Sequence, residues 1–138
     1  INRSSREIGK LAITFLQKAQ NSFFMFLNFT EVEQTALRYR EGGEEYSNAL
    51  RRCDHQIGRI YHYLRSKGRV DKTIFIITSN YSYQKNTKAP GATQDIWILS
   101  NKKVLYKGSQ LDIIPTIYKI YGLDWHLINL PLTGKPLI

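Results

Sequence analysis

The sequence predicts an α/β fold in which a central, mostly parallel sheet is flanked by helices. Segments with helical periodicity alternate along the 138 residues with short apolar runs. Those runs are rich in β-branched and aromatic residues, which is typical of strands that are buried on both faces. Hydrophobic residues make up 42% and charged residues 22%, an ordinary globular composition. We therefore expect a single domain over residues 1–138, ending in a loop tail at 124–138.

Three segments are predicted to be helical, because apolar residues recur in them at intervals of three and four positions. They are 3–20, 44–67 and 111–121. The second and third are each followed by a glycine, Gly68 and Gly122, as is common after the last turn of a helix. The second is the most clearly amphipathic of the three.

Three apolar runs are predicted to be strands of the central sheet, at 22–29, 73–78 and 95–100. A fourth, shorter run at 104–106 is expected to form an edge strand. The polar stretches between them are expected to be loops: 30–43, which has room for a helical turn, and 79–94.

The net charge is strongly positive, since 20 Lys and Arg face 11 Asp and Glu, giving +9. This charge suggests an anionic neighbour such as nucleic acid, lipid headgroups or an acidic protein. The longest apolar run has five residues, 23–27, against the roughly 20 that a membrane helix needs, so no membrane span is expected. The single cysteine, Cys53, excludes an intrachain disulfide. No signal-peptide pattern follows Ile1, so the sequence leaves the compartment open.

Basic residues concentrate on the segment 44–67 and its flanks. A solvated helix face is the plain interpretation, and binding of RNA, acidic lipid or an acidic partner is the alternative. The candidate anion-binding residues are Arg51, Arg52, Arg59, Lys85 and Lys88. His55 and His62 lie seven residues apart on the same predicted helix, a rise of about 10 Å, which is too far for both to bind one metal ion.

Nine short motifs follow one another in a fixed order along the chain. They are Phe26-Leu-Asn-Phe-Thr30, Glu31-Val-Glu33, Tyr39-Arg-Glu-Gly-Gly-Glu-Glu-Tyr46, Ala49-Leu-Arg-Arg-Cys-Asp-His-Gln-Ile-Gly58, Asp71-Lys-Thr-Ile-Phe-Ile-Ile-Thr-Ser79, Asp95-Ile-Trp-Ile-Leu99, Leu111-Asp-Ile-Ile-Pro-Thr-Ile117, Tyr121-Gly-Leu123 and Gly134-Lys-Pro-Leu137. In this order the chain resembles the C-terminal part of the alkaline phosphatase superfamily, in its sulfatase and type I phosphodiesterase branch. The resemblance runs from about residue 8 to the end.

The resemblance implies two divalent metal ions, usually zinc, held by carboxylates and imidazoles at the ends of the strands. The positions that correspond to these ligands are Glu33, Leu37, Asn80 and Tyr81. Glu33 keeps a carboxylate, but Leu37 has no donor atom, and Asn80 offers only a neutral carbonyl oxygen. Tyr81 is a poor ligand unless its phenol is deprotonated. The loop that follows also lacks the expected histidine, so we expect neither an intact metal site nor a bound cofactor.

These substitutions favour a pseudoenzyme, a non-catalytic domain that acts as a structural or protein-binding component. One alternative is a metal-dependent phosphoesterase, sulfatase or phosphotransferase with an altered site that includes Glu33, Asn80 and the loop 85–88. Another is a basic module that binds RNA or acidic lipid. The resemblance places the nucleophile in an N-terminal half that this chain does not contain. We therefore expect association with another polypeptide, either that half or a different subunit.

Overall fold

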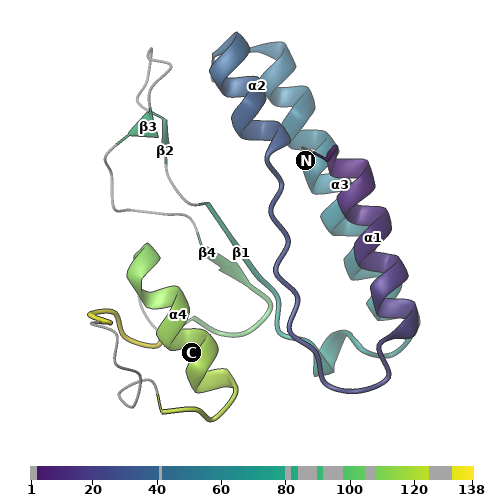
Figure 1. Ribbon diagram of the computed structural model, residues 1–138, viewed down its shortest axis with the longest axis vertical. Coiled ribbons are helices and arrows are strands. Elements are labelled where there is room, and N and C mark those ends of the chain that lie inside the picture. The colour runs from purple at the N-terminus through teal and green to yellow at the C-terminus, as the bar shows by residue number, and fades with distance from the viewer. Residues whose placement is uncertain are drawn as a thin grey trace. The chain divides into compact units, whose positions relative to one another are not determined.

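The computed structural model describes residues 3–40, 42–79, 82–83, 90–91, 98–104, 108–124 and 132–138, and the structural statements below concern these residues. They form two compact units. The described part of the first unit runs from residue 3 to 72, and that of the second begins at residue 73. Helices dominate the first unit, whereas the second combines short strands with one helix (Figure 1).

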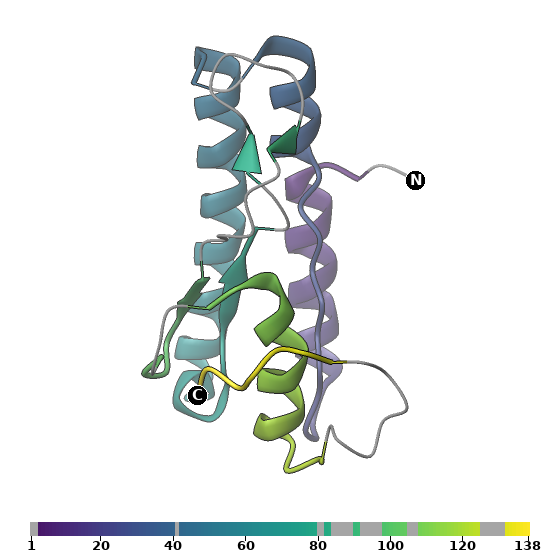
Figure 2. The ribbon, with the colours of Figure 1, turned by 90° about the vertical axis from the view of Figure 1, so that its left-hand side faces the viewer.

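Three helices build the first unit: α1 (Ser5–Lys18), α2 (Glu31–Tyr39) and α3 (Glu44–Ser66), followed by a 3₁₀ turn, η1 (Val70–Lys72). Helix α1 lies beside α3 and runs in the same direction, because an extended segment carries the chain back to the start of α2 (Figures 1 and 2). The short connection after α2 then makes α2 and α3 antiparallel neighbours.

The helix ends explain why α1 and α3 were predictable. Helix α1 begins with a capping box, in which Ser4 Oγ accepts from the Glu7 backbone N–H and the Glu7 carboxylate accepts from that of Ser4. Helix α3 ends before Gly68, whose φ of +62° is a left-handed conformation that glycine adopts without steric cost. Both predicted helices are confirmed within two residues at each end.

Small and aliphatic side chains form the core between these helices. The buried apolar residues are Ala12 and Leu16 of α1, Ala36 of α2, and Ala49, Ile60 and Leu64 of α3. Helices α1 and α3 approach closely at Gly9, where an added Cβ would lie 2.6 Å from Gln56 Oε1 and 2.9 Å from Gln56 Cβ. The lack of a side chain at Gly9 therefore permits this packing.

The strand predicted at 22–29 is wrong, since these residues belong to neither a strand nor a helix. The segment is extended, with residues alternately half-buried and exposed: Phe23 packs edge-on against Phe15 of α1, whereas Phe24 and Phe26 are 58% and 79% exposed. The aromatic run suggested burial on both faces, but one face is half-buried and the other is exposed.

The loop predicted at 30–43 is also wrong, because nine of its residues form α2. This helix buries a single side chain, that of Ala36, so its apolar periodicity is too short to be recognised against its polar residues. The backbone leaves the helix at Arg40, which has a φ of +75°.

The expected central parallel sheet is contradicted by the second unit. Strand β1 (Ile76–Thr78) pairs antiparallel with β4 (Ile98–Ser100), and β2 (Ser82–Tyr83) pairs antiparallel with β3 (Pro90–Gly91). Parallel pairing requires a crossover connection, usually a helix. Both pairings described here are antiparallel and therefore need no such crossover. The strand predicted at 73–78 is shorter than expected, since only its last three residues form β1. Of the strand predicted at 95–100, residues 98–100 form β4, and residues 95–97 lie outside the described structure.

The C-terminal segment, residues 132–138, packs within the second unit. A 3₁₀ turn, η2 (Gln110–Asp112), leads into α4 (Ile113–Ile120), which confirms most of the predicted helix at 111–121. Residues 132–138 have no regular structure, yet Leu137 is only 2% exposed. A Cβ added to Gly108 would lie 2.6 Å from Leu137 Cδ1, so the tail packs tightly into this unit. Of the predicted edge strand, Val104 is not in a strand and residues 105–106 are not described.

Candidate functional site

Helix α2 carries two of the four positions that the resemblance associates with metal ligands. Glu33 and Leu37 are separated by four residues, so their side chains emerge on the same face one turn apart. Glu33 is half-buried and Leu37 is 43% exposed. Asn80 and Tyr81 lie outside the described residues. Within the described part of the chain, no group of three or more His, Cys, Asp or Glu side chains could hold a metal ion.

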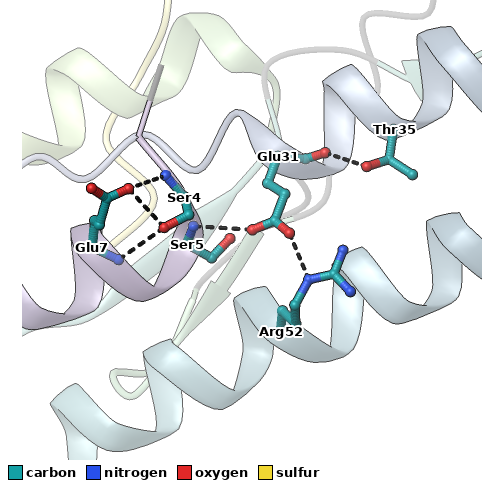
Figure 3. A network of polar contacts seen from close by, with 6 residues as sticks. All are labelled: Ser4, Ser5, Glu7, Glu31, Thr35 and Arg52. Atoms are coloured by element: carbon teal, nitrogen blue, oxygen red, sulfur yellow. Dashed lines mark hydrogen bonds and ion pairs between the residues drawn. The ribbon is translucent and has the colours of Figure 1, made fainter. Parts of the chain in front are cut away.

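The carboxylate of Glu31, two residues earlier on α2, connects all three helices of the first unit (Figure 3). Its Oε2 accepts a hydrogen bond from the Ser5 backbone N–H at 3.0 Å, and its Oε1 accepts from Arg52 Nε at 2.5 Å. The Ser5 N–H belongs to the first turn of α1, where backbone donors have no partner within the helix. Glu31 therefore caps α1 from outside while pairing with a cation on α3.

The electrostatic setting keeps this carboxylate ionised. Burial raises the pKa of Glu31, but the hydrogen bonds from Ser5 and from Arg52 outweigh it and hold the pKa below its usual value. Because both oxygens already accept hydrogen bonds from the protein, the geometry assigns Glu31 a structural role.

The three candidate anion-binding arginines of α3 differ in how they are engaged. Arg52 forms the ion pair with Glu31, which is the only ion pair among the described residues. Arg51 instead donates to Asn48 Oδ1 and Arg59 donates to Gln56 Oε1, each at 2.9 Å. These acceptors are neutral amides, so neither Arg51 nor Arg59 forms an ion pair with a described carboxylate. Lys85 and Lys88, the other two candidates, lie outside the described residues.

An arrangement on α3 that was not predicted from the sequence is a straight row of residues along its outer face. We call it the α3 stripe, and it consists of Arg51, His55, Gly58, His62 and Arg65. Its four side chains are exposed, and Gly58 is half-buried. In the sequence, the shared four-and-three spacing of these arginines and histidines is the signal that places them in one row.

The single cysteine is unsuited to act as a nucleophile. Burial raises the pKa of the Cys53 thiol to about 11, and the negative charges of Asp54 and Glu31 act in the same direction. Because the thiolate is the reactive form, Cys53 stays protonated and unreactive at neutral pH.

The second unit contains a polar cluster around Asp112. Its Oδ2 accepts from the Ser109 backbone N–H at 2.6 Å and from Ser109 Oγ at 3.2 Å, while its Oδ1 accepts from the Lys135 N–H at 2.8 Å. Thr116 Oγ1 donates to the Asp112 carbonyl at 2.6 Å and accepts from the Leu137 N–H at 2.9 Å. The cluster thereby ties the C-terminal segment to α4.

Comparisons with protein-family models, with curated proteins and with solved structures returned no match. The resemblance to the alkaline phosphatase superfamily therefore depends on the motifs themselves. Among the described helices, none combines the length and the apolar character that crossing a bilayer requires.

Proposed function

We propose that this chain is a non-catalytic relative of the alkaline phosphatase superfamily and acts as a protein-binding component. The observation that carries the proposal is the geometry of α2, which presents Glu33 and Leu37 one turn apart on the same face. The superfamily pattern has an Asp and a His at this spacing. Leu37 has an aliphatic group where an imidazole would donate an electron pair, so these two positions cannot chelate a metal ion.

The cluster around Asp112 supports the same proposal. Asp112 and Thr116 belong to one of the resembling motifs, and Lys135 and Leu137 belong to another. Their hydrogen bonds hold two segments of the polypeptide together. A motif maintained by packing of the chain can persist after the catalytic groups are lost.

Exposed aromatic side chains favour a role in binding another polypeptide. Phe24 and Phe26 are 58% and 79% exposed on the same side of their extended segment. Complete burial of a phenylalanine side chain contributes about 1.5–3 kcal/mol, so covering these two residues would stabilise a complex substantially.

Metal content and hydrolysis test the non-catalytic assignment. The purified chain is analysed for bound metal by mass spectrometry and assayed with bis(4-nitrophenyl) phosphate and 4-nitrophenyl sulfate in the presence of zinc or manganese. We expect no stoichiometric metal and no hydrolysis above the buffer rate. Turnover that a chelator abolishes would overturn the proposal in favour of an enzyme with an altered site.

A further inference from the structure

Side chains of the second unit receive the backbone of the C-terminal segment, residues 132–138. Asp112 Oδ1 accepts a hydrogen bond from the Lys135 N–H at 2.8 Å. Thr116 Oγ1 accepts one from the Leu137 N–H at 2.9 Å. Thr116 follows Asp112 by four residues, so the two acceptors lie one turn apart on the same side. We call the surface that meets the segment the α4 surface, and it consists of Gly108, Leu111, Asp112 and Thr116.

The segment and the α4 surface fit each other through a glycine on each side. A Cβ added to Gly108 would lie 2.6 and 2.8 Å from the two δ-carbons of Leu137. A Cβ added to Gly134 of the segment would lie 2.1 Å from the Leu111 backbone oxygen. Neither glycine has a positive φ, so the backbone conformation does not require glycine at either position. The close contact between the segment and the α4 surface requires it instead.

The end of the segment is apolar and lies against apolar residues. Leu137 is 2% exposed, and Leu137 and Ile138 together border a pocket of the second unit. The other residues that line this pocket come from β1, β4 and α4 and include Ile76, Ile98 and Ile113. An extended peptide is commonly recognised in this way, with hydrogen bonds to its backbone and an apolar contact for one side chain.

The α4 surface keeps its own hydrogen bonds when the segment is taken away. Asp112 Oδ2 also accepts from the Ser109 backbone N–H at 2.6 Å, and Thr116 Oγ1 donates to the Asp112 carbonyl at 2.6 Å. Strand β1 pairs with β4 without any residue of the segment. Each acceptor therefore retains a partner, and the segment meets the surface as a separate peptide would.

We propose that two copies of this chain exchange their C-terminal segments, so that residues 132–138 of each copy occupy the α4 surface of the other. The occupant is a second copy because the sequence that lies on this surface is the chain's own. Exchange of an identical segment preserves every contact, which makes it a low-cost route to a dimer. An attached segment competes at an effective concentration of about millimolar, so the native chain exchanges when concentrated. The proposal uses contacts of the second unit alone and does not depend on the superfamily relationship.

Two variants with complementary defects test the exchange. Leu137→Ala weakens the segment and leaves the α4 surface intact. Gly108→Val leaves the segment intact, but its added side chain would take the space of the Leu137 δ-carbons. The two are mixed at about 100 µM each in about 0.3 M salt, which screens the repulsion between chains of charge +9. We expect native mass spectrometry to show at least tenfold more heterodimer than dimer of either variant alone.

A double variant provides the matched control for this mixture. Gly108→Val combined with Leu137→Ala has neither an intact segment nor an intact α4 surface. Mixed with Leu137→Ala under the same conditions, it should give no more heterodimer than the single variants give dimer. This control separates exchange of the segment from association through any other surface.

A synthetic peptide of residues 132–138 gives a second measurement that needs no folded Gly108→Val chain. Added at about 1 mM to Leu137→Ala, the peptide should slow hydrogen exchange of the α4 amides at least fivefold. The same peptide carrying Leu137→Ala should leave their exchange unchanged. The amides of α3 in the first unit are the internal reference and should not respond to either peptide.

Three outcomes would overturn the inference: a mixture that stays monomeric, equal heterodimer formation with the double variant, or a peptide that protects α4 no better than its control. Protection by the peptide in a mixture that stays monomeric would make a free peptide the occupant and would also remove the exchange. These measurements involve neither metal nor hydrolysis, so their failure is distinct from the failure of the proposed function.

Discussion

The two units are held together by different kinds of interaction. The first unit buries small and aliphatic side chains along two long helices, so its stability is spread over many contacts. The second depends on hydrogen bonds between side chains and backbone that join distant segments, such as Asp112 with Lys135 and Thr116 with Leu137. Single substitutions should therefore lower the free energy of unfolding of the second unit more than that of the first.

The largest effect is expected from Gly134→Ala in the second unit. A Cβ at this position would lie 2.1 Å from the Leu111 backbone oxygen, which cannot move without displacing η2. Overpacking against backbone should cost about 3 kcal/mol, at the upper end of such effects. Native-state hydrogen exchange should show faster exchange of amides in 108–124 and unchanged exchange in α3.

Gly122→Ala is the control for this substitution. Gly122 also belongs to the second unit and has a φ of +65°, but an added Cβ there would meet nothing within 4 Å. This substitution should lower the free energy of unfolding by only about 1 kcal/mol, because a residue with a Cβ is disfavoured in the left-handed conformation. Equal effects of the two substitutions would contradict the close approach at Gly134.

An intermediate effect is expected from Asp112→Asn. The amide has one acceptor oxygen, so it cannot accept from both Ser109 and Lys135, and the loss should be about 2 kcal/mol. Thermal unfolding of the second unit, followed by methyl NMR signals of Ile113 and Leu137, measures it. A loss confined to α1 and α3 would contradict the assigned role.

The same variant should change how the second unit responds to acid. Burial raises the pKa of Asp112, but hydrogen bonds from the Lys135 and Ser109 backbones outweigh it and hold the pKa below its usual value. Because the folded-state pKa is the lower one, the stabilisation is complete above about pH 4 and is lost as the pH falls through the folded-state pKa. We expect the Leu137 methyl signal of the native chain to weaken in this range more steeply than that of Asp112→Asn.

A smaller effect than that of Asp112→Asn is expected in the first unit, from Gly9→Ala. The new Cβ would crowd Gln56, but that side chain can partly move away, so the cost should be about 1.5 kcal/mol. Adding Gln56→Ala should recover part of the loss, and a double-mutant cycle by urea unfolding measures this coupling. Strictly additive effects would show that the two residues do not meet.

The sequence predicts α1, α3 and α4 well because their periodicity, caps and terminal glycines act locally. The strand predicted at 22–29 is wrong, because an aromatic run does not show whether one face of the segment or both faces will be buried. The direction of the β1–β4 pairing depends on the path of the chain between the strands, which their own residues do not encode.

The candidate sites also differ in whether the sequence alone could predict them. The α3 stripe is a local pattern of one helix and could have been predicted from its spacing. The contacts of Asp112 with Lys135 and of Glu31 with Ser5 join residues 23 and 26 positions apart. Both depend on irregular segments whose course is determined by packing, so sequence periodicity gives no signal for them.

The parallel arrangement of α1 and α3 has a consequence for biosynthesis. Helix α1 leaves the ribosome before α3, and Gly9 meets Gln56, which is translated 47 residues later. Until α3 is translated, the apolar side of α1 cannot pack against it. Helices α2 and α3, in contrast, can associate early because their connection is short. The apolar side of nascent α1 is thus exposed to contact with other proteins during the interval before α3 emerges.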